Sequence, residues 1–365
     1  MTLRILPGVL RATRLVRSGE LMAATAAIQS ALRGRAPSTA AESPNADVAT
    51  IEGFCRVIDK TPDPRKPDRF VTRSYTSAAG TREYKTYVPT MERGHAAPLL
   101  VMLHGCKQGP DDFAAATRMN ALAEEHGFIV VYPVQAGKAN VSKCWNWFQA
   151  KHQHRDTGEP SLIAGITREV MAAHGVDGRR VYIAGLSAGG AMAAIMGATY
   201  PDLYAAVGIH SGLAYAAARD VPSAFAAMRG KKSRSVRRKA RVGATAGAVP
   251  TIVFHGDSDT TVHPSNVDEL IEQASPQSSA AKARENPFPE HERTVERGER
   301  GGRAYTRTAY CDVAGKSVVE QWLVHGAAHA WCGGSGEGSF SDPAGPDASR
   351  EMLRFFFQHE NPFRD

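Results

Sequence analysis

Five short apolar runs divide the middle of the chain, and stretches with helical spacing separate most of them. The runs are continuous rather than alternating, which is typical of strands buried on both faces of a parallel sheet. They cover residues 98–104, 128–132, 180–184, 205–210 and 251–255. Helical spacing covers residues 111–126, 162–174 and 187–200. This alternation predicts an α/β fold with a mainly parallel central sheet and helices on both faces.

The segments around this core have other patterns. Residues 69–75 and 82–89 are rich in strand-forming residues and flank Ala78-Ala-Gly-Thr81, which predicts an antiparallel hairpin. Residues 317–324 predict the last strand, and residues 348–359 predict a final helix. The charged, proline-containing residues 276–303 predict an exposed excursion.

The first fifty residues differ in composition from the rest. Leucines and isoleucines at helical spacing predict one or two amphipathic helices over residues 1–35, and small and polar residues make 36–50 a linker. We therefore expect an N-terminal amphipathic helical extension with its linker, residues 1–49, and one α/β domain, residues 50–365.

Composition and charge exclude several classes of protein. The 365 residues are 42% hydrophobic and 22% charged, as in a globular protein, and the net charge is +7. One dense basic run, residues 229–241, lacks aromatic residues, so we interpret it as a solvated surface and expect no nucleic-acid partner. No apolar run approaches the ~20 residues that span a bilayer, so we expect no membrane span.

The N-terminus also bears on the compartment. Arginines interrupt its first apolar patches, whereas a secretory signal needs an unbroken apolar segment. We therefore expect a cytoplasmic protein, with a secreted or periplasmic protein as the alternative.

Five cysteines are spaced without any CxxC pair, which excludes the common zinc patterns. They are Cys55, Cys106, Cys144, Cys311 and Cys332. Cys106 with Cys144, and Cys311 with Cys332, are candidate disulfides in an oxidising compartment. We expect no metal and no cofactor.

A serine lies between two glycines where a buried strand passes into a helix. The sequence is Gly185-Leu-Ser-Ala-Gly189, so Ser187 occupies the turn. Glycines two residues before and after the serine let strand and helix approach closely. The helix that follows directs its free N–H groups at the turn. This is the pattern of a nucleophile elbow, and Ser187 is the predicted nucleophile.

A serine nucleophile needs a base and a carboxylate that orients it. In hydrolases of this kind the acid follows a later strand, and the histidine follows the last one. Asp257 and Asp259 both follow the strand at 251–255, and His325 and His329 both follow residues 317–324. The residues alone leave each choice open; the member not used for catalysis is expected to bond loop backbone.

The developing oxyanion needs two N–H donors. Ala188 follows the nucleophile, and Cys106 lies in the loop after the strand at 98–104, so these two are the candidates. Trp145 and Trp147 lie in the aromatic cluster Cys144-Trp-Asn-Trp-Phe148, and Trp331 closely follows the candidate base. They fit either a substrate groove or the core, and we enter them as candidate substrate-binding residues.

Seven motifs occur in an order that resembles the poly(3-hydroxybutyrate) depolymerase esterase family of the α/β-hydrolase superfamily. They are HGCKQ at 104–108, CWNWF at 144–148, GEPSLIAGI at 158–166, GLSAGGAM at 185–192, YPDLYAAVGIHSGL at 200–213, HGDSDTTVHPSN at 255–266 and HGAAHAWCGG at 325–334. The resemblance covers roughly residues 70–358. It implies Ser187 as nucleophile, Asp259 as acid, His329 as base and Cys106 as a backbone donor.

The resemblance implies a serine ester hydrolase that cleaves poly(3-hydroxybutyrate) or its oligomers to 3-hydroxybutyrate units through an acyl-enzyme. The chain looks most like intracellular members without a substrate-binding domain, and the N-terminal helices would then dock on a storage granule. A feruloyl or acetylxylan esterase is the alternative within the same family pattern. A non-catalytic granule-binding or nucleic-acid-binding protein is the alternative from another class.

Overall fold

The chain divides into two units, Met1–Thr61 and Pro62–Asp365, and only the second contains described residues. The computed structural model describes residues 69–90, 96–231, 249–274 and 292–364. The predicted N-terminal helices, the linker and most of the basic run at 229–241 lie outside these ranges.

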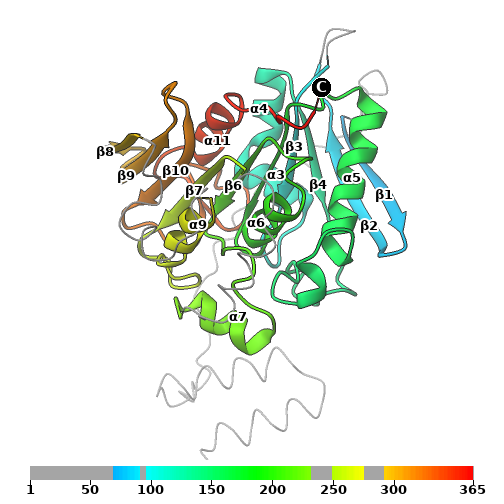
Figure 1. Cartoon of the computed structure of the whole chain (residues 1–365), viewed down its shortest axis with the longest axis horizontal. Coiled ribbons are helices and arrows are strands. Elements are labelled where there is room, and N and C mark those ends of the chain that lie inside the picture. The colour runs from blue at the N-terminus through cyan, green and yellow to red at the C-terminus, as the bar shows by residue number, and fades with distance from the viewer. Residues whose placement is uncertain (1–68, 91–95, 232–248, 275–291, 365) are drawn as a thin grey trace, which may run out of the picture. The chain divides into compact units, whose positions relative to one another are not determined.

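A ten-stranded sheet forms the centre of the described residues (Figure 1). Its order is β1-β2-β4-β3-β5-β6-β7-β10-β9-β8. The six strands from β4 to β10 in this order are parallel, and the pairs at both edges are antiparallel. The parallel strands are β4 Ile129–Pro133, β3 Leu99–Leu103, β5 Val181–Leu186, β6 Ala206–His210, β7 Thr251–Gly256 and β10 Ser317–Val324. The outer strands are β1 Phe70–Ser77, β2 Gly80–Tyr87, β9 Arg303–Cys311 and β8 Glu292–Arg300. The predicted mainly parallel sheet is confirmed.

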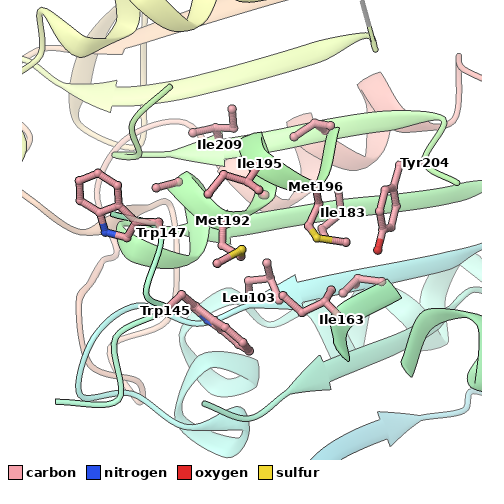
Figure 2. Packing of buried hydrophobic residues seen from close by; sticks show 14 of the residues in the cluster. Leu103, Trp145, Trp147, Ile163, Ile183, Met192, Ile195, Met196, Tyr204 and Ile209 are labelled. Carbon is pink, nitrogen blue, oxygen red and sulfur yellow. The ribbon is translucent and has the colours of Figure 1, made fainter. Parts of the chain in front are cut away.

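Helices cover both faces of the sheet because its central strands bury both rows of side chains. Leu99, Val101 and Leu103 of β3 belong to one apolar cluster, and Leu100 and Met102 belong to the other. The first cluster includes side chains of α5 Gly158–His174, α6 Ala188–Thr199, α7 Val221–Met228 and α9 Asn266–Ala274 (Figure 2). The second includes side chains of α3 Pro110–Thr117, α4 Met119–His126 and α11 Ala348–Phe356.

The helix expected over residues 111–126 is two helices, because Arg118 between α3 and α4 has φ 54°. The break frees the last carbonyls of α3 for partners outside the helix. Ser335 donates its N–H to Ala116 at 2.9 Å, and the Ser349 hydroxyl donates to the Thr117 carbonyl at 2.7 Å. These bonds join α3 to the chain beyond β10.

The excursion expected over residues 276–303 is wrong in part, because residues 292–300 form strand β8 at the sheet edge. Nearly all of its residues are exposed, so no apolar alternation marks it in the sequence. The predicted hairpin at the opposite edge is confirmed as β1 and β2.

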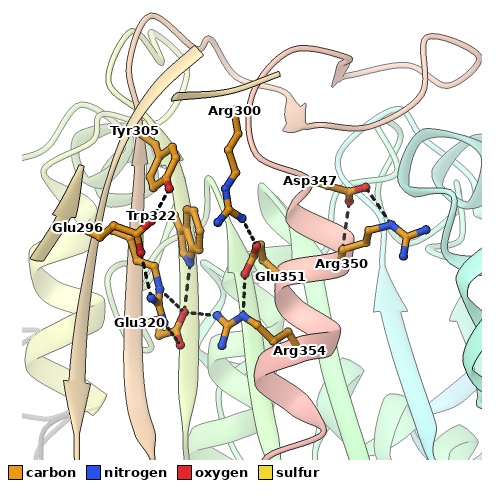
Figure 3. A network of polar contacts seen from close by, with 10 residues as sticks. Glu296, Arg300, Tyr305, Glu320, Trp322, Asp347, Arg350, Glu351 and Arg354 are labelled. Atoms are coloured by element: carbon orange, nitrogen blue, oxygen red, sulfur yellow. Dashed lines mark hydrogen bonds and ion pairs between the residues drawn. The ribbon is translucent and has the colours of Figure 1, made fainter. Parts of the chain in front are cut away.

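A buried carboxylate fastens the β8 side of the sheet to α11 (Figure 3). Glu320 of β10 has no exposed surface, and its two oxygens accept bonds from Arg307 of β9 at 2.9 Å and Arg354 of α11 at 2.5 Å. The indole N–H of Trp322 also donates to Glu320, at 3.3 Å. Two guanidinium groups from different elements therefore neutralise one buried charge.

Candidate active site

The turn between β5 and α6 holds Ser187 in a strained conformation. Its φ is 57° and its ψ is −119°, a region that non-glycine residues rarely occupy. The Ser187 N–H donates to the His210 carbonyl at 2.9 Å, which fastens the turn to β6. Close approach makes Gly189 necessary, because a Cβ there would lie 2.0 Å from the Leu103 carbonyl oxygen of β3. The turn has the geometry of a nucleophile elbow.

Two backbone N–H groups lie beside this turn on separate segments. Ala188 is the first residue of α6, and the first intrahelical bond runs from Ala191 to Ser187, so the Ala188 N–H precedes the helical ladder. Cys106 lies in the loop after β3, where Gly105 and Gln108 bond each other through backbone and side chain. Within the described residues the Cys106 N–H has no hydrogen-bond partner, although those of Gly105, Lys107 and Gln108 all do.

A disulfide between Cys106 and Cys144 fixes the loop that carries this free N–H group, as one of the two candidate pairings predicted. Lys107 reinforces the link by donating its N–H to the Ser142 carbonyl at 2.7 Å. The second candidate pairing is wrong, because Cys311 and Cys332 are both free. Cys311 faces the first residue of β10, whereas Cys332 follows the other end of that strand, so their sulfur atoms lie too far apart to bond.

The chain after β7 and the chain after β10 meet in a carboxylate–imidazole pair. His329 Nδ1 lies 2.7 Å from Asp259 Oδ2. The other carboxylate oxygen accepts the N–H groups of Thr261 at 2.9 Å and Val262 at 2.8 Å. The Asp259 side chain has no exposed surface and that of His329 is 12% exposed. His255 Nε2 lies 3.4 Å from Asp259 Oδ2 and adds a fourth polar neighbour.

Asp259 remains ionised in this setting. Burial alone would raise its pKa, but the bond and charge of His329, the Val262 N–H and His255 together outweigh burial, so the pKa lies below its usual value. An ionised Asp259 fixes the proton of His329 on Nδ1 and leaves Nε2 able to accept one.

A second carboxylate–imidazole pair joins the same two segments. His325 Nδ1 lies 2.8 Å from Asp257 Oδ2, and Gly326 donates its N–H to Asp257 Oδ1 at 2.7 Å. The other ring nitrogen of His325 lies 3.0 Å from the Thr306 hydroxyl. Both nitrogens of His325 are therefore engaged, whereas Nε2 of His329 forms no hydrogen bond among the described residues. Asp257 accepts a bond from loop backbone, which is the role expected for whichever acid is not used in catalysis.

His210 connects the serine turn to the segment after His329. Ser187 and His329 form no direct hydrogen bond to each other. The His210 carbonyl bonds the Ser187 N–H, while His210 Nε2 accepts the N–H of Cys332 at 3.1 Å. The His210 ring also stacks on Trp331 with centroids 5.1 Å apart. Burial lowers the pKa of His210 to about 3, so the ring is neutral and can accept.

Comparison with known protein families identifies the family of the chain. The family model described as Esterase PHB depolymerase matches residues 82–282, more than half of the chain. The chain belongs to this esterase family. Over 183 residues it is 40% identical to poly(3-hydroxyalkanoate) depolymerase C of Paucimonas lemoignei, an alignment that covers 48% of this chain and 44% of the relative. The chain thus spans less than half the length of that depolymerase.

Two further comparisons concern other members and the fold. Feruloyl esterase B of Neurospora crassa is 30% identical over 215 residues, covering 56% of this chain and 72% of the relative. The structure of an acetyl xylan esterase from Aspergillus awamori superposes with a TM-score of 0.57 at 19% identity, covering 79% of this chain and 99% of that one. The parallel sheet, the elbow and this likeness establish the α/β-hydrolase fold.

The three tryptophans entered as candidate substrate-binding residues of this esterase lie in the core. Trp145 and Trp331 have no exposed surface and Trp147 is 5% exposed. Trp145 and Trp147 pack in the first apolar cluster (Figure 2). Trp331 packs against Phe113 and His210, and its indole N–H donates to Ser349 at 3.0 Å. Because they are buried, their position does not support a groove-lining role. The sequence could not show this, since aromatic residues are equally common in a core and in a groove.

Sequence reasoning missed one residue that positions the loop joined by the disulfide to Cys106. Glu159 at the start of α5 is buried, and its carboxylate accepts the Asn146 N–H at 2.7 Å and the Gln135 side-chain amide at 2.5 Å. These bonds position the loop that carries Cys144. The glutamate lies within the motif GEPSLIAGI, which offered the signal.

Two features are absent from the described part of the esterase. There, no group of three or more His, Cys, Asp or Glu side chains is placed to hold a metal ion. No helix in the described ranges is long and apolar enough to cross a bilayer.

Proposed function

We propose that this chain is a serine ester hydrolase that cleaves poly(3-hydroxybutyrate) or its oligomers to 3-hydroxybutyrate units. The observation that carries the proposal is the buried Asp259–His329 pair. Its 2.7 Å bond leaves His329 Nε2 free in the loops at the carboxyl ends of the parallel strands, where Ser187 occupies its elbow. The other aspartate–histidine pairs differ from this one. Both ring nitrogens of His325 are engaged, and the one unpartnered ring nitrogen of His255 lies in a side chain with no exposed surface, whereas the His329 side chain is 12% exposed.

In the proposed mechanism, Ser187 Oγ attacks the ester carbonyl carbon while its proton passes to His329 Nε2. The N–H groups of Cys106 and Ala188 donate to the oxyanion. The carbon–oxygen bond to the leaving alcohol breaks as His329 returns the proton to that oxygen, and an acyl-enzyme remains. Water then attacks the acyl carbon as His329 accepts its proton. The bond between the acyl carbon and Ser187 Oγ breaks, His329 returns the proton to Oγ, and the hydroxy acid departs. Asp259 holds the imidazole in the required tautomer throughout.

The substrate class rests on the relatives. Sequence identity is higher to the polyester depolymerase, which favours a polyester of 3-hydroxy acids. The feruloyl esterase aligns over more of its length, which makes esters of the plant cell wall the second candidate.

Release of 3-hydroxybutyrate from amorphous polyhydroxybutyrate granules tests the proposal, with methyl ferulate assayed in parallel. We expect release by the wild type and none by Ser187→Ala. Release that persists in Ser187→Ala would overturn the assigned nucleophile. Cleavage of methyl ferulate without release from granules would move the substrate to plant-wall esters.

For the compartment, we propose the alternative rather than the cytoplasm. The Cys106–Cys144 disulfide supports a secreted or periplasmic protein, because disulfides persist in oxidising compartments. Alkylation of free thiols in cell fractions, followed by mass measurement, tests this: a reduced Cys106 in the native protein would contradict it.

Docking on a storage granule through residues 1–49 is a separate hypothesis, which unchanged granule co-sedimentation after deletion of residues 1–45 would exclude.

A further inference from the structure

Two short segments carry the proposed acid and base, and they are joined along their length. Asp257 donates its N–H to the Val324 carbonyl at 3.1 Å, and Ser258 donates to the Ala327 carbonyl at 3.1 Å. The contact is close: a Cβ on Gly256 would lie 2.1 Å from the Ala327 carbonyl oxygen. The turn that bears His329 therefore lies directly against the end of β7.

The two carboxylate–imidazole pairs bridge these segments in parallel. The inner pair is Asp259–His329, and the outer pair is Asp257–His325, only two and four residues earlier in the chain. Asp257 uses both oxygens, one for the His325 ring and one for the Gly326 N–H, so it fixes the start of the turn from two sides.

We infer that Asp257 and His325 are positioning residues that set the place of the catalytic base His329. The inference rests on the proposed function, because it assigns His329 as the base. His325 does not replace His329, since its second ring nitrogen is held by Thr306. Its effect passes through the turn at 325–329.

Exposure separates this role from a role in stability. The side chain of His325 is 38% exposed and that of Asp257 is 35% exposed. A pair this open to water adds little to the free energy of unfolding. Its loss would still let the turn shift, and proton transfer depends steeply on a displacement of a fraction of an ångström. The inference therefore predicts a large effect on turnover and a small one on melting temperature.

A matched pair of variants at one position tests this role. Asn resembles the Nδ1 side of histidine and retains a donor for Asp257, whereas Leu has nearly the shape of Asn and no donor. With p-nitrophenyl butyrate, we expect His325→Leu to lower kcat about tenfold with KM within about twofold, and His325→Asn to stay within about twofold of wild type. Thr306→Val, which removes only the outer contact of His325, serves as control and is expected to stay near wild type.

The other partner supplies the second arm of the test. Asp257→Ala is expected to lower kcat as much as His325→Leu, and the double variant is expected to lose no more, because both changes break one bond. Asp257→Asn keeps an acceptor for the Gly326 N–H and serves if the alanine variant fails to fold; it is expected to lower kcat about fivefold.

The outcomes separate the inference from the proposed function. An unchanged kcat in His325→Leu, or an equal loss in His325→Asn and His325→Leu, would overturn the positioning role. A fall in kcat that merely follows a fall in melting temperature would overturn it too. A wild-type protein that is inert towards p-nitrophenyl butyrate, with Ser187 unlabelled by a fluorophosphonate probe, would instead refute the proposed function and the inference with it.

Discussion

Asp259 accepts hydrogen bonds from three donors although water cannot reach it. His329 holds one oxygen, and the N–H groups of Thr261 and Val262 hold the other. Each donor favours the ionised form, so the negative charge persists where burial alone would remove it. This charge selects the tautomer of His329 that the proposed mechanism requires.

Replacing this charge is expected to damage catalysis more than folding. In Asp259→Asn the amide can present a donor to His329 Nδ1 and fix the wrong tautomer, and we expect kcat to fall by about 10³–10⁴. The measurement is kcat on p-nitrophenyl butyrate. Asp257→Asn is the matched comparison two residues away, and equal losses in the two variants would refute the assignment of Asp259 as the acid.

At this scale the sequence predicted the nucleophile but could not choose its partners from the residues alone. The glycines on either side identify Ser187 in the sequence, whereas Asp257 and Asp259 follow the same strand only two residues apart. Only the fold reveals that Asp259 is the buried carboxylate and that the second ring nitrogen of His325 contacts Thr306. The family resemblance named Asp259 and His329, and the geometry is consistent with that choice.

The disulfide belongs to the scale of elements, because it joins the loop after β3 to the loop after β4. It closes a loop with a sequence separation of 38 residues, and loss of such a bridge costs about 3–4 kcal/mol of unfolding free energy in a chain-entropy account. We expect reduction to lower the urea midpoint and also kcat, since Cys106 is one of the two proposed oxyanion donors. The measurement is unfolding and turnover with and without reductant.

The control for this bridge is Cys144→Ser, which leaves the backbone of Cys106 intact. We expect this variant to match the reduced wild type and to be insensitive to reductant. Because Cys311 and Cys332 are free, the bridge is the one disulfide that reductant can break among the described residues. Continued sensitivity in Cys144→Ser would show that another thiol is responsible.

The contact between α6 and the end of β3 leaves no room for a methyl group. A Cβ at Gly189 would meet backbone at 2.0 Å, and backbone cannot rotate away as a side chain can. We expect Gly189→Ala to abolish esterase activity and to lower the melting temperature. Gly137→Ala, whose Cβ would meet nothing within 4 Å, is the control. A fully active Gly189→Ala would contradict the packing at the elbow.

Elements were predictable where burial imposes a pattern. The continuous apolar runs of the parallel strands are visible because both faces are covered. The break at Arg118 leaves no pattern in the sequence, since the carbonyls that it frees bond to residues more than 200 positions away. Strand β8 is invisible for the opposite reason: its residues contact mostly water.

Buried neutral histidines control how the whole molecule responds to acid. Burial lowers the pKa of His210 to about 3 and those of His104 and His359 to about 4. The unfolded chain binds these protons near pH 6.5 whereas the native state does not, so their stability contribution is complete above pH 6.5 and is lost as pH falls towards 4. At pH 5.5 each histidine is expected to lower the free energy of unfolding by about 1.4 kcal/mol relative to pH 8.

Urea unfolding between pH 8 and pH 5 measures this loss, and His359 allows a direct test away from the active site. Its ring packs on Phe355 with centroids 4.6 Å apart, and its Nε2 has no hydrogen-bond partner in the described part of the chain. We expect His359→Phe to keep the packing and to reduce the loss at pH 5.5 by about 1.4 kcal/mol. An unchanged pH dependence would refute the contribution of His359.

The exposed strand β8 has a consequence for molecules gathered on a solid. On the proposed polyester, adsorbed molecules would be crowded laterally, and the open edge of β8 on one molecule would lie close to that of its neighbours. The side chains of β8 are mostly charged, including Glu292, Arg293, Arg297 and Glu299. Pairing two such edges would strip water from many charges at once, which disfavours fibril-like contacts between adjacent molecules. The charges that obscure the strand pattern in the sequence would therefore keep adsorbed molecules from pairing through β8, even in a dense layer.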